Sequence, residues 1–401
     1  MYGFSKHVCR GMACAVIAVM STVGTSTQAA AADTNGITAK TIKIGMYGPL
    51  TGSQSSWGHP VMNGAAMVYQ DINEKGGIHG RKIEIVREDG ACDSAKTLAA
   101  VKKLVHREKV FMINSGICSG ATMAARQEII NNKVPLMLFA ASLDALTTPV
   151  SRYVFTVAPT GRHDGLSIGE FVQSIPGAKR IAIVGHADEW AKSKSEAFKA
   201  VAKQANLEIV ADETLEKNIT DAAAQVLAIK RVNADAVVLL TYPGPTAAFL
   251  RDAHKYNLKT KFVGNNSLID LDALAERVGN LDALQTTFIT ATIVGPIGSP
   301  EMSPYEQMLK KYFPKDTVKA ESFYGTASAI TVVEALKQAG PDLTREKFID
   351  AMEKMQGFNA GIAPCSIGFS SDNHQGCQTQ TIWTLRGSKV VDVGPRWKDL
   401  R

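Results

Sequence analysis

Apolar and polar residues alternate with two different periods along residues 42–93. This segment reads IKIGMYGPLTGSQSSWGHPVMNGAAMVYQDINEKGGIHGRKIEIVREDGACD. Its beginning predicts a strand followed by a Gly/Ser-rich loop, and the next apolar residues recur at the spacing of one helix face. The residues of that face are Val61, Ala65, Val68 and Ile72. Pro60 suits the first turn of the helix, the pair Gly76-Gly77 ends it, and residues 82–88 alternate as a second strand.

The same alternation of strands and helices continues for about two hundred residues. Strands are predicted at residues 110–113, 134–139, 181–185, 207–211, 236–241 and 261–264. Helices are predicted at residues 98–105, 119–131, 193–205, 221–232 and 246–256. Regular alternation predicts an α/β fold with two similar lobes, each a mostly parallel sheet covered by helices on both faces. A break near residues 156–164 separates the two lobes.

The pattern changes after Phe323. Long helices are predicted at residues 323–339 and 344–355, and residues 364–393 have the pattern of antiparallel strands with a Gly/Asn turn. Such a section can cross back to complete the first lobe. The predicted lobes are residues 41–158 with about 293–375, and residues 159–292 with about 376–401.

The N-terminus has the order of a cleavable signal peptide. Lys6 and Arg10 precede an apolar run over residues 12–23, and small residues follow. The run is too short to span a bilayer comfortably. We therefore predict that residues 1–31 are a signal peptide, with cleavage near residues 30–32, and that the mature chain is exported and soluble.

Charge and cysteine content add two constraints. The formal charge of +6 falls to +4 without Lys6 and Arg10, and no basic block occurs, which argues against a nucleic-acid partner. Cys9 and Cys14 lie in the predicted signal, which leaves an even number of cysteines for disulfides in an exported chain. Four cysteines allow three pairings, and their order along the chain favours Cys92–Cys118 and Cys365–Cys377. A zinc site is the weaker alternative, because no Cys-x-x-Cys pair exists.

The sequence offers little that points to catalysis. The patterns G-x-G-x-x-G and G-x-x-x-x-G-K-[ST] do not occur, and the eight histidines have no metal-ligand spacing. The pattern G-x-S-x-G occurs at residues 165–169 (GLSIG). An exported α/β hydrolase would need this serine on an exposed nucleophile elbow directly after a strand, and no strand is predicted there, so that class is disfavoured. We predict that the protein is not an enzyme and uses neither a cofactor nor a metal.

The segments quoted above carry a resemblance to a known family. The phrase GPLTGSQSSWG, the following NGAAMVYQDINEKGGIHGRKIEIVREDGACD, and the segments SGICSGAT and VPLMLFAAS are similar to the periplasmic Leu/Ile/Val-binding proteins. This resemblance to type I solute-binding proteins covers nearly the whole mature chain. It implies a monomeric bilobal clamp that hinges closed on a ligand and delivers it to the permease subunits of an ABC importer in the inner membrane.

Candidate ligand-binding residues lie where predicted strands end. Ser119 starts a helix, whose N-terminus attracts anions, although a plain N-cap serine is the alternative from sequence alone. Ala140, Ala141 and Ser142 follow a buried strand, either as a cradle for a ligand or as a tight turn. By the resemblance, these four residues hold the ligand carboxylate.

Three aromatic residues are expected to wall the same cleft. Trp57 lies in the first loop, Trp190 follows the strand that ends at Gly185, and Tyr242 follows the strand at residues 236–241. Ordinary half-buried packing is the alternative for each. By the resemblance these positions hold aromatic residues near the ligand, and Phe323 and Tyr324 lie close to another pocket segment.

Asn266 departs from the pattern of the family. Amino-acid-binding relatives place a glutamate at about this position to pair with the ligand ammonium, whereas this chain has Asn265 and Asn266. An amide does not offset a buried ammonium as a carboxylate does. Replacement of the missing acid by the other nearby acids (Asp188, Glu189 or Asp270) stays open.

These observations favour a periplasmic solute-binding protein whose ligand is a small apolar or aromatic carboxylate. Uptake of hydrophobic or branched-chain amino acids is one alternative. A periplasmic ligand sensor that reports to a receptor is another, because it would share the fold and differ only in its partner.

Overall fold

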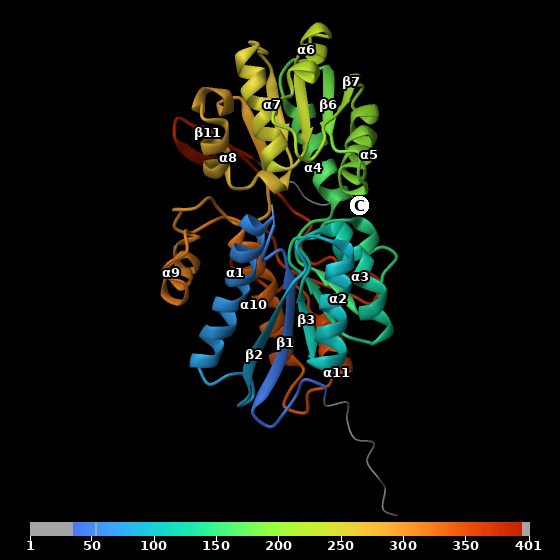
Figure 1. Cartoon of the computed structure of the whole chain (residues 1–401), viewed down its shortest axis with the longest axis vertical. Coiled ribbons are helices and arrows are strands. Elements are labelled where there is room, and N and C mark those ends of the chain that lie inside the picture. The colour runs from blue at the N-terminus through green and yellow to red at the C-terminus, as the bar shows by residue number, and fades with distance from the viewer. Residues whose placement is uncertain (1–34, 53, 395–401) are drawn as a thin grey trace, which may run out of the picture. The chain divides into compact units, whose positions relative to one another are not determined.

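Two mostly parallel β-sheets form the framework of the protein (Figure 1). The computed structural model describes residues 35–52 and 54–394, so the predicted signal peptide lies outside the described residues. The first sheet has the strand order β2-β1-β3-β4-β5, and the second has the order β12-β11-β10-β9-β8-β6-β7. Only β11 runs antiparallel to its neighbours β10 and β12. The predicted fold class is therefore confirmed.

The first sheet and its helices come from both ends of the described chain. Its strands are β1 (Thr41–Gly48), β2 (Lys82–Asp89), β3 (Met112–Ser115), β4 (Leu136–Leu138) and β5 (Val154–Thr156). Its helices are α1 (Ser55–Glu74), α2 (Ser94–Lys102), α3 (Ser119–Asn131), α10 (Ser322–Gln338) and α11 (Arg345–Lys354). Helices α1 and α10 pack together over one face, and α2 and α3 cover the other. Asn114 of β3 donates to the hydroxyl of Ser328 at 3.0 Å, which ties α10 to this sheet.

The second sheet has the same layered arrangement. Its strands are β6 (Arg180–Gly185), β7 (Glu208–Thr214), β8 (Ala236–Leu240), β9 (Lys261–Gly264), β10 (Thr287–Ala291), β11 (Thr381–Arg386) and β12 (Lys389–Asp392). Its helices are α4 (Gly161–Ser174), α5 (Glu189–Gln204), α6 (Ala223–Arg231), α7 (Pro243–Lys255) and α8 (Leu271–Val278), and α9 (Ser303–Tyr312) lies between β10 and α10 in the chain. Every residue of β8 is buried, because Val237 and Leu239 face one layer of helices and Val238 and Leu240 face the other.

Most predicted elements are confirmed within a few residues, and the helix at 119–131 and the strand at 261–264 match the structure at both ends. Four helices begin several residues earlier than predicted. Helix α1 begins at Ser55 rather than near Pro60, α2 begins at Ser94, α5 begins at Glu189, and α7 begins at Pro243. Prolines in the first turn of a helix lose no hydrogen bond, which explains why Pro243 and Pro245 do not delay α7.

Five elements were missed, and one break was placed wrongly. The missed elements are strands β5 and β10 and helices α4, α8 and α9. The sequence did contain a signal for α8, because the buried residues Leu271, Leu274 and Val278 recur at helical spacing. The predicted break near residues 156–164 is shorter, because α4 already begins at Gly161. Among the described residues, no helix is long and apolar enough to cross a membrane, and no cluster of three metal-ligating side chains occurs.

Both predicted cysteine pairs are joined in the structure. Cys92 and Cys118 have Cα atoms 5.5 Å apart, and Cys365 and Cys377 have Cα atoms 5.8 Å apart. The first pair connects the segment after β2 to the residue that caps α3. The carboxyl end of β2 and the N-terminus of α3 are therefore fixed to one another.

Candidate ligand-binding site

A pocket of about 600 Å³ lies where carboxyl ends of strands from both sheets meet helix N-termini. Seven of the eight predicted binding residues line it: Trp57, Ser119, Ala140, Ser142, Trp190, Tyr242 and Asn266. Ala141 does not line the pocket, because its side chain packs in the core between the first sheet and helices α2 and α3. Ligands bind at this edge of the sheet in open α/β folds.

The start of α3 gives the pocket an anion-binding character. Cys118 is the N-cap residue and Ser119, Gly120 and Ala121 form the first turn, and all four line the pocket. The first backbone N–H groups of a helix have no partner within that helix, and they favour negative charge. The expectation that Ser119 starts this helix is confirmed, and the side chain of the N-cap residue Cys118 makes no capping bond.

Each of the two serine hydroxyls in the pocket accepts a hydrogen bond from a neighbouring donor. The backbone N–H of Ser142 donates to Ser119 Oγ at 3.0 Å, and Trp190 Nε1 donates to Ser142 Oγ at 3.1 Å. A hydroxyl has one proton to donate, and here its oxygen already accepts from another group. Both hydroxyl protons are therefore available for an acceptor in the pocket. The two serines belong to the side of the pocket formed by the first sheet, and Trp190 belongs to α5 beside the second sheet. This relay of hydrogen bonds from Trp190 to Ser142 and Ser119 therefore connects the two sides of the pocket.

The aromatic residues form two pairs, one on helices of the second sheet and one on helices of the first. The rings of Trp190 and Tyr242 stack with centroids 4.5 Å apart, and Trp57 lies 5.7 Å from the ring of Tyr324. Trp57 is in the first turn of α1 rather than in a loop, so the prediction of its location was wrong. Tyr324 lines the pocket and donates from its hydroxyl to the Asn266 carbonyl at 3.2 Å, whereas Phe323 does not line this pocket.

His186, which sequence reasoning missed, holds the backbone of Tyr242 in place. Its Nδ1 donates to the Leu215 carbonyl at 2.7 Å, and its Nε2 accepts from the backbone N–H of Tyr242 at 3.0 Å. The two partners fix the neutral tautomer, since a carbonyl only accepts and an amide N–H only donates. Burial lowers the pKa of His186 further, despite the opposing effect of the bond to Leu215. The imidazole is therefore a fixed neutral support for Tyr242.

The adjacent asparagines have different roles. The side chain of Asn265 is fully buried and donates to the carbonyls of Leu239 and Thr241, both at 3.0 Å, so it holds β9 against the end of β8. Asn266 lines the pocket. Its Oδ1 accepts from Lys194 Nζ at 3.3 Å, and Lys194 also pairs with Asp164 at 2.7 Å. Lys194 lies one helical turn after Trp190, and this spacing was the one signal in the sequence that could have drawn attention to it.

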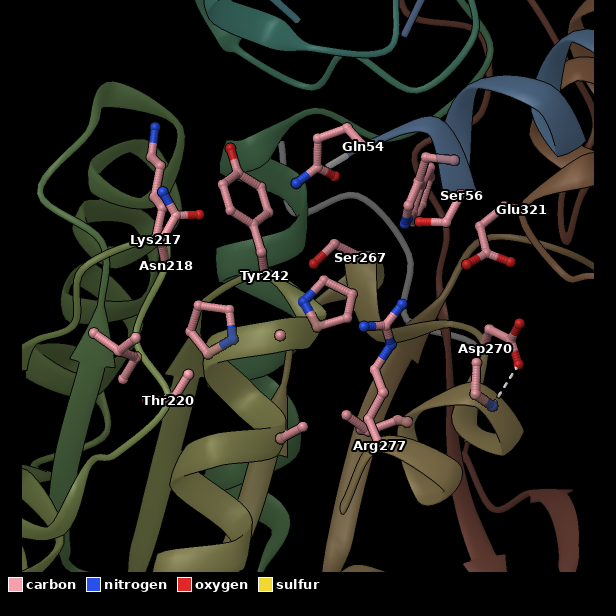
Figure 2. A pocket seen from close by; sticks show the side chains of 18 of the residues that line it. Gln54, Ser56, Lys217, Asn218, Thr220, Tyr242, Ser267, Asp270, Arg277 and Glu321 are labelled. Carbon is pink, nitrogen blue, oxygen red and sulfur yellow. Dashed lines mark hydrogen bonds between the residues drawn. The ribbon is translucent and has the colours of Figure 1, made fainter. Parts of the chain in front are cut away.

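The acids near the pocket already have partners. Asp188 caps α5 and pairs with Lys217 at 2.7 Å, and Glu189 pairs with Lys192 at 3.7 Å with its side chain largely exposed. Asp270 caps α8 and lines a neighbouring pocket of about 420 Å³ together with Glu321 and Arg277 (Figure 2). Asp188 and Glu189 therefore each face a lysine, and one oxygen of Asp270 is used in the cap of α8.

Comparison with known proteins defines the class to which this framework and pocket belong. The family model described as periplasmic binding protein matches residues 41–389, so the chain belongs to this family. An amino acid binding protein of Pseudomonas aeruginosa is 23% identical over 326 residues, which cover 81% of this chain and 83% of the relative. The resemblance seen in the sequence is confirmed.

Solved structures share the fold. A branched chain amino acid ABC transporter protein from Thermus thermophilus, with bound valine, has a TM-score of 0.81 at 21% identity and covers 90% of this chain and 97% of its own. A solute-binding protein of an ABC transporter from R. palustris, in complex with benzoate, has a TM-score of 0.77 at 20% identity and covers 90% of this chain and 98% of its own. At these identities the similarity establishes the architecture.

Proposed function

We propose that this protein captures a small, largely apolar carboxylate between two lobes in the periplasm and delivers it to the permease of an ABC importer. In this proposal residues 1–31 are a signal peptide, and the lobes are residues 41–158 with about 293–375 and residues 159–292 with about 376–401. The family match and the ABC-transporter proteins of the same fold support the general role. The benzoate complex supports an aromatic acid as ligand.

The observation that carries the proposal is that the pocket is lined by hydrogen-bond donors and by aromatic rings. The N-terminus of α3, the two serine hydroxyls and the amide of Asn266 offer donors, and the aromatic rings offer flat apolar surface. A carboxylate satisfies such donors with charge-assisted hydrogen bonds. Asp188 and Glu189 are the carboxylates among the described lining residues, and each already faces a lysine, which weakens its attraction for a ligand ammonium.

Isothermal titration calorimetry on protein unfolded and refolded free of ligand tests this proposal. The panel compares benzoate, 4-hydroxybenzoate, 3-phenylpropanoate and 4-methylpentanoate with leucine, valine and phenylalanine. We expect at least one acid to bind in the micromolar range or tighter, and the amino acids to bind at least about 100-fold more weakly. Burial of an unpaired ammonium costs several kcal/mol, and about 1.4 kcal/mol is tenfold in affinity.

Low-micromolar binding of leucine, valine or phenylalanine would contradict the proposal and favour amino-acid uptake. Uptake of the radiolabelled acid by cells with and without the gene separates import from sensing. An import function predicts that uptake falls when the gene is deleted and returns with the wild-type gene, whereas a sensor leaves uptake unchanged.

A further inference from the structure

A buried ion pair lies directly behind the pocket wall at Asn266. The side chains of Lys194 and Asp164 are both 0% exposed, and Lys194 Nζ lies 2.7 Å from Asp164 Oδ2. Lys194 is not among the residues that line the pocket. Its ammonium contacts two residues that do, since it lies 3.3 Å from Asn266 Oδ1 and 4.8 Å from the centroid of the Trp190 ring.

Asp164 is held by more than the lysine. Its carboxylate also accepts from the hydroxyl of Thr290, from Gln380 Nε2 at 2.9 Å and from the backbone N–H of Asn266 at 3.4 Å. Four donors from separate segments fix this carboxylate, and it in turn fixes the ammonium of Lys194. A buried charge with a complete set of partners has a defined position.

The position of Lys194 determines which way the Asn266 amide faces. An ammonium has three donors and no acceptor, so the amide oxygen must face it. The NH₂ group then lies at the other side of the amide, and no described residue offers it an acceptor within hydrogen-bond distance. Because Asn266 lines the pocket, its NH₂ group is a donor for a ligand.

We propose that Lys194 is a positioning residue that determines ligand specificity by orienting Asn266. With the amide locked, the pocket selects acids that carry a second oxygen acceptor, such as a keto, hydroxyl or ether oxygen, and disfavours those that carry an ammonium. This inference rests on the proposed capture of a carboxylate and names its chemical class. A site that hydrogen-bonds an acceptor group of its ligand rejects analogues that lack this acceptor. It also rejects analogues that carry a donor at the same position.

The ion pair also blocks the simplest route to an amino-acid site. In the variant Asn266→Glu, the new carboxylate would lie next to Lys194 and pair with it. We therefore expect that Asn266→Glu alone does not give micromolar leucine or phenylalanine binding. The same substitution combined with Lys194→Met and Asp164→Asn removes the competing charges and raises amino-acid affinity relative to Asn266→Glu alone.

Calorimetry with matched ligands tests the proposed role of Lys194. One set is phenylpyruvate, phenylalanine and 3-phenylpropanoate, and a second set is benzoate with its 2-, 3- and 4-methoxy derivatives. In the wild-type protein we expect at least one acid with an oxygen acceptor to bind at least about fivefold more tightly than its parent acid, the scale of one hydrogen bond. Lys194→Met frees the amide to rotate, so this preference falls below about twofold.

The control is Lys199→Met on the same helix, where the lysine makes a surface pair with Asp212. It keeps the wild-type preference. Asn266→Leu removes the amide while leaving the ion pair, so it abolishes the preference even if Lys194→Met fails to fold. The ratio of affinities is the readout, because a merely structural defect weakens both members of a ligand pair alike.

The outcomes separate this inference from the proposed function. If no carboxylate binds the wild-type protein, the proposed function itself fails. If acids bind but no acceptor-bearing acid exceeds its parent, or if Asn266→Leu keeps the wild-type preference, the proposed role of Lys194 is wrong and carboxylate capture stands.

Discussion

At the scale of single residues, hydrogen bonds from neighbouring donors direct the polar groups of the pocket toward the ligand. Trp190 and the backbone of Ser142 each donate to a serine oxygen, and Lys194 donates to the oxygen of Asn266. In each case the neighbouring group is a donor, which leaves the proton of the accepting group for the ligand. Trp190 and Ser142 line the pocket themselves, whereas Lys194 does not. The preference for an anion therefore depends on residues that do not all contact it.

The indole N–H of Trp190 gives the first prediction at this scale. Trp190→Phe keeps an aromatic ring beside Tyr242 but removes the hydrogen bond to Ser142 Oγ. The serine proton is then no longer held toward the ligand. We expect carboxylate affinity to fall about tenfold, or about 1.4 kcal/mol, by calorimetry.

Trp383→Phe is the matched control for that measurement. Trp383 is buried in β11, outside the pocket lining, and its indole N–H has no partner among the described residues. Its removal should leave ligand affinity unchanged. Equal losses in the two variants, or no loss in Trp190→Phe, would rule out the proposed relay.

At the scale of elements, two helix ends bring two carboxyl groups together. Glu321 immediately precedes α10 and Asp270 caps α8, and both line the pocket shown in Figure 2. Burial raises the pKa of Glu321 to about 8, and the charge of Asp270 adds to this effect, whereas Lys319 opposes it. One oxygen of Glu321 has no partner among the described residues. The pair is therefore most stable when Glu321 holds a proton.

This arrangement predicts a defined pH dependence of stability. Between pH of about 4.5 and 8 the folded protein keeps a proton on Glu321 that the unfolded chain has lost, so stability falls as pH rises through this window. Glu321→Gln mimics the protonated form and removes that loss. We expect the variant to match the wild-type protein in urea unfolding at pH 5 and to be more stable at pH 8.5, by a few kcal/mol at about 1.4 kcal/mol per pKa unit.

Glu334→Gln on the same helix serves as the control, because Glu334 is bonded to Gln338 at the surface. Its unfolding free energy should follow the wild-type pH profile. If Glu321→Gln also follows that profile, Glu321 is ionised in the folded protein and the predicted protonation is wrong.

At the scale of the whole molecule, the chain passes between the two sheets at three places. The first lies between β5 and α4, the second follows β10, and the third precedes β11. Asp164 lies just after the first crossing, and it accepts from Thr290 near the second and from Gln380 near the third. One buried carboxylate thus holds all three crossings together, so motion between the lobes is expected to be a hinge about this point.

Small-angle X-ray scattering tests this hinge motion. We expect the radius of gyration of the ligand-free protein to fall when a tight carboxylate is added to saturation, because a ligand that contacts both walls favours the closed state. The radius of gyration of Trp190→Phe is measured at the same ligand-bound fraction for comparison, because this variant lacks the hydrogen bond from Trp190 to Ser142. An unchanged radius at full saturation would contradict closure.

The order of the elements could be predicted from the sequence because the period of a strand or helix depends on local chain geometry. The ends of parallel strands lie at one edge of a sheet, so Ser119, Ser142 and Tyr242 could also be assigned to one site. Sequence reasoning could not predict the short strands β5 and β10 or the first turns of α1 and α5. Few residues define the period of such short elements, and tertiary packing decides where they end.

The sequence by itself determined the class of protein, the alternation of strands and helices and the cysteine pairs, and it indicated seven of the residues that line the pocket. Only the tertiary structure decided what polarises that pocket. Asp164, Lys194, Asn266 and Gln380 lie far apart in the chain, and a hydrogen bond between such residues depends on how four separate segments pack. The same packing gives the two neighbouring asparagines different roles, since Asn265 bonds to the backbone of the sheet and Asn266 lies in the pocket. The sequence could not show this difference, because the two side chains are identical.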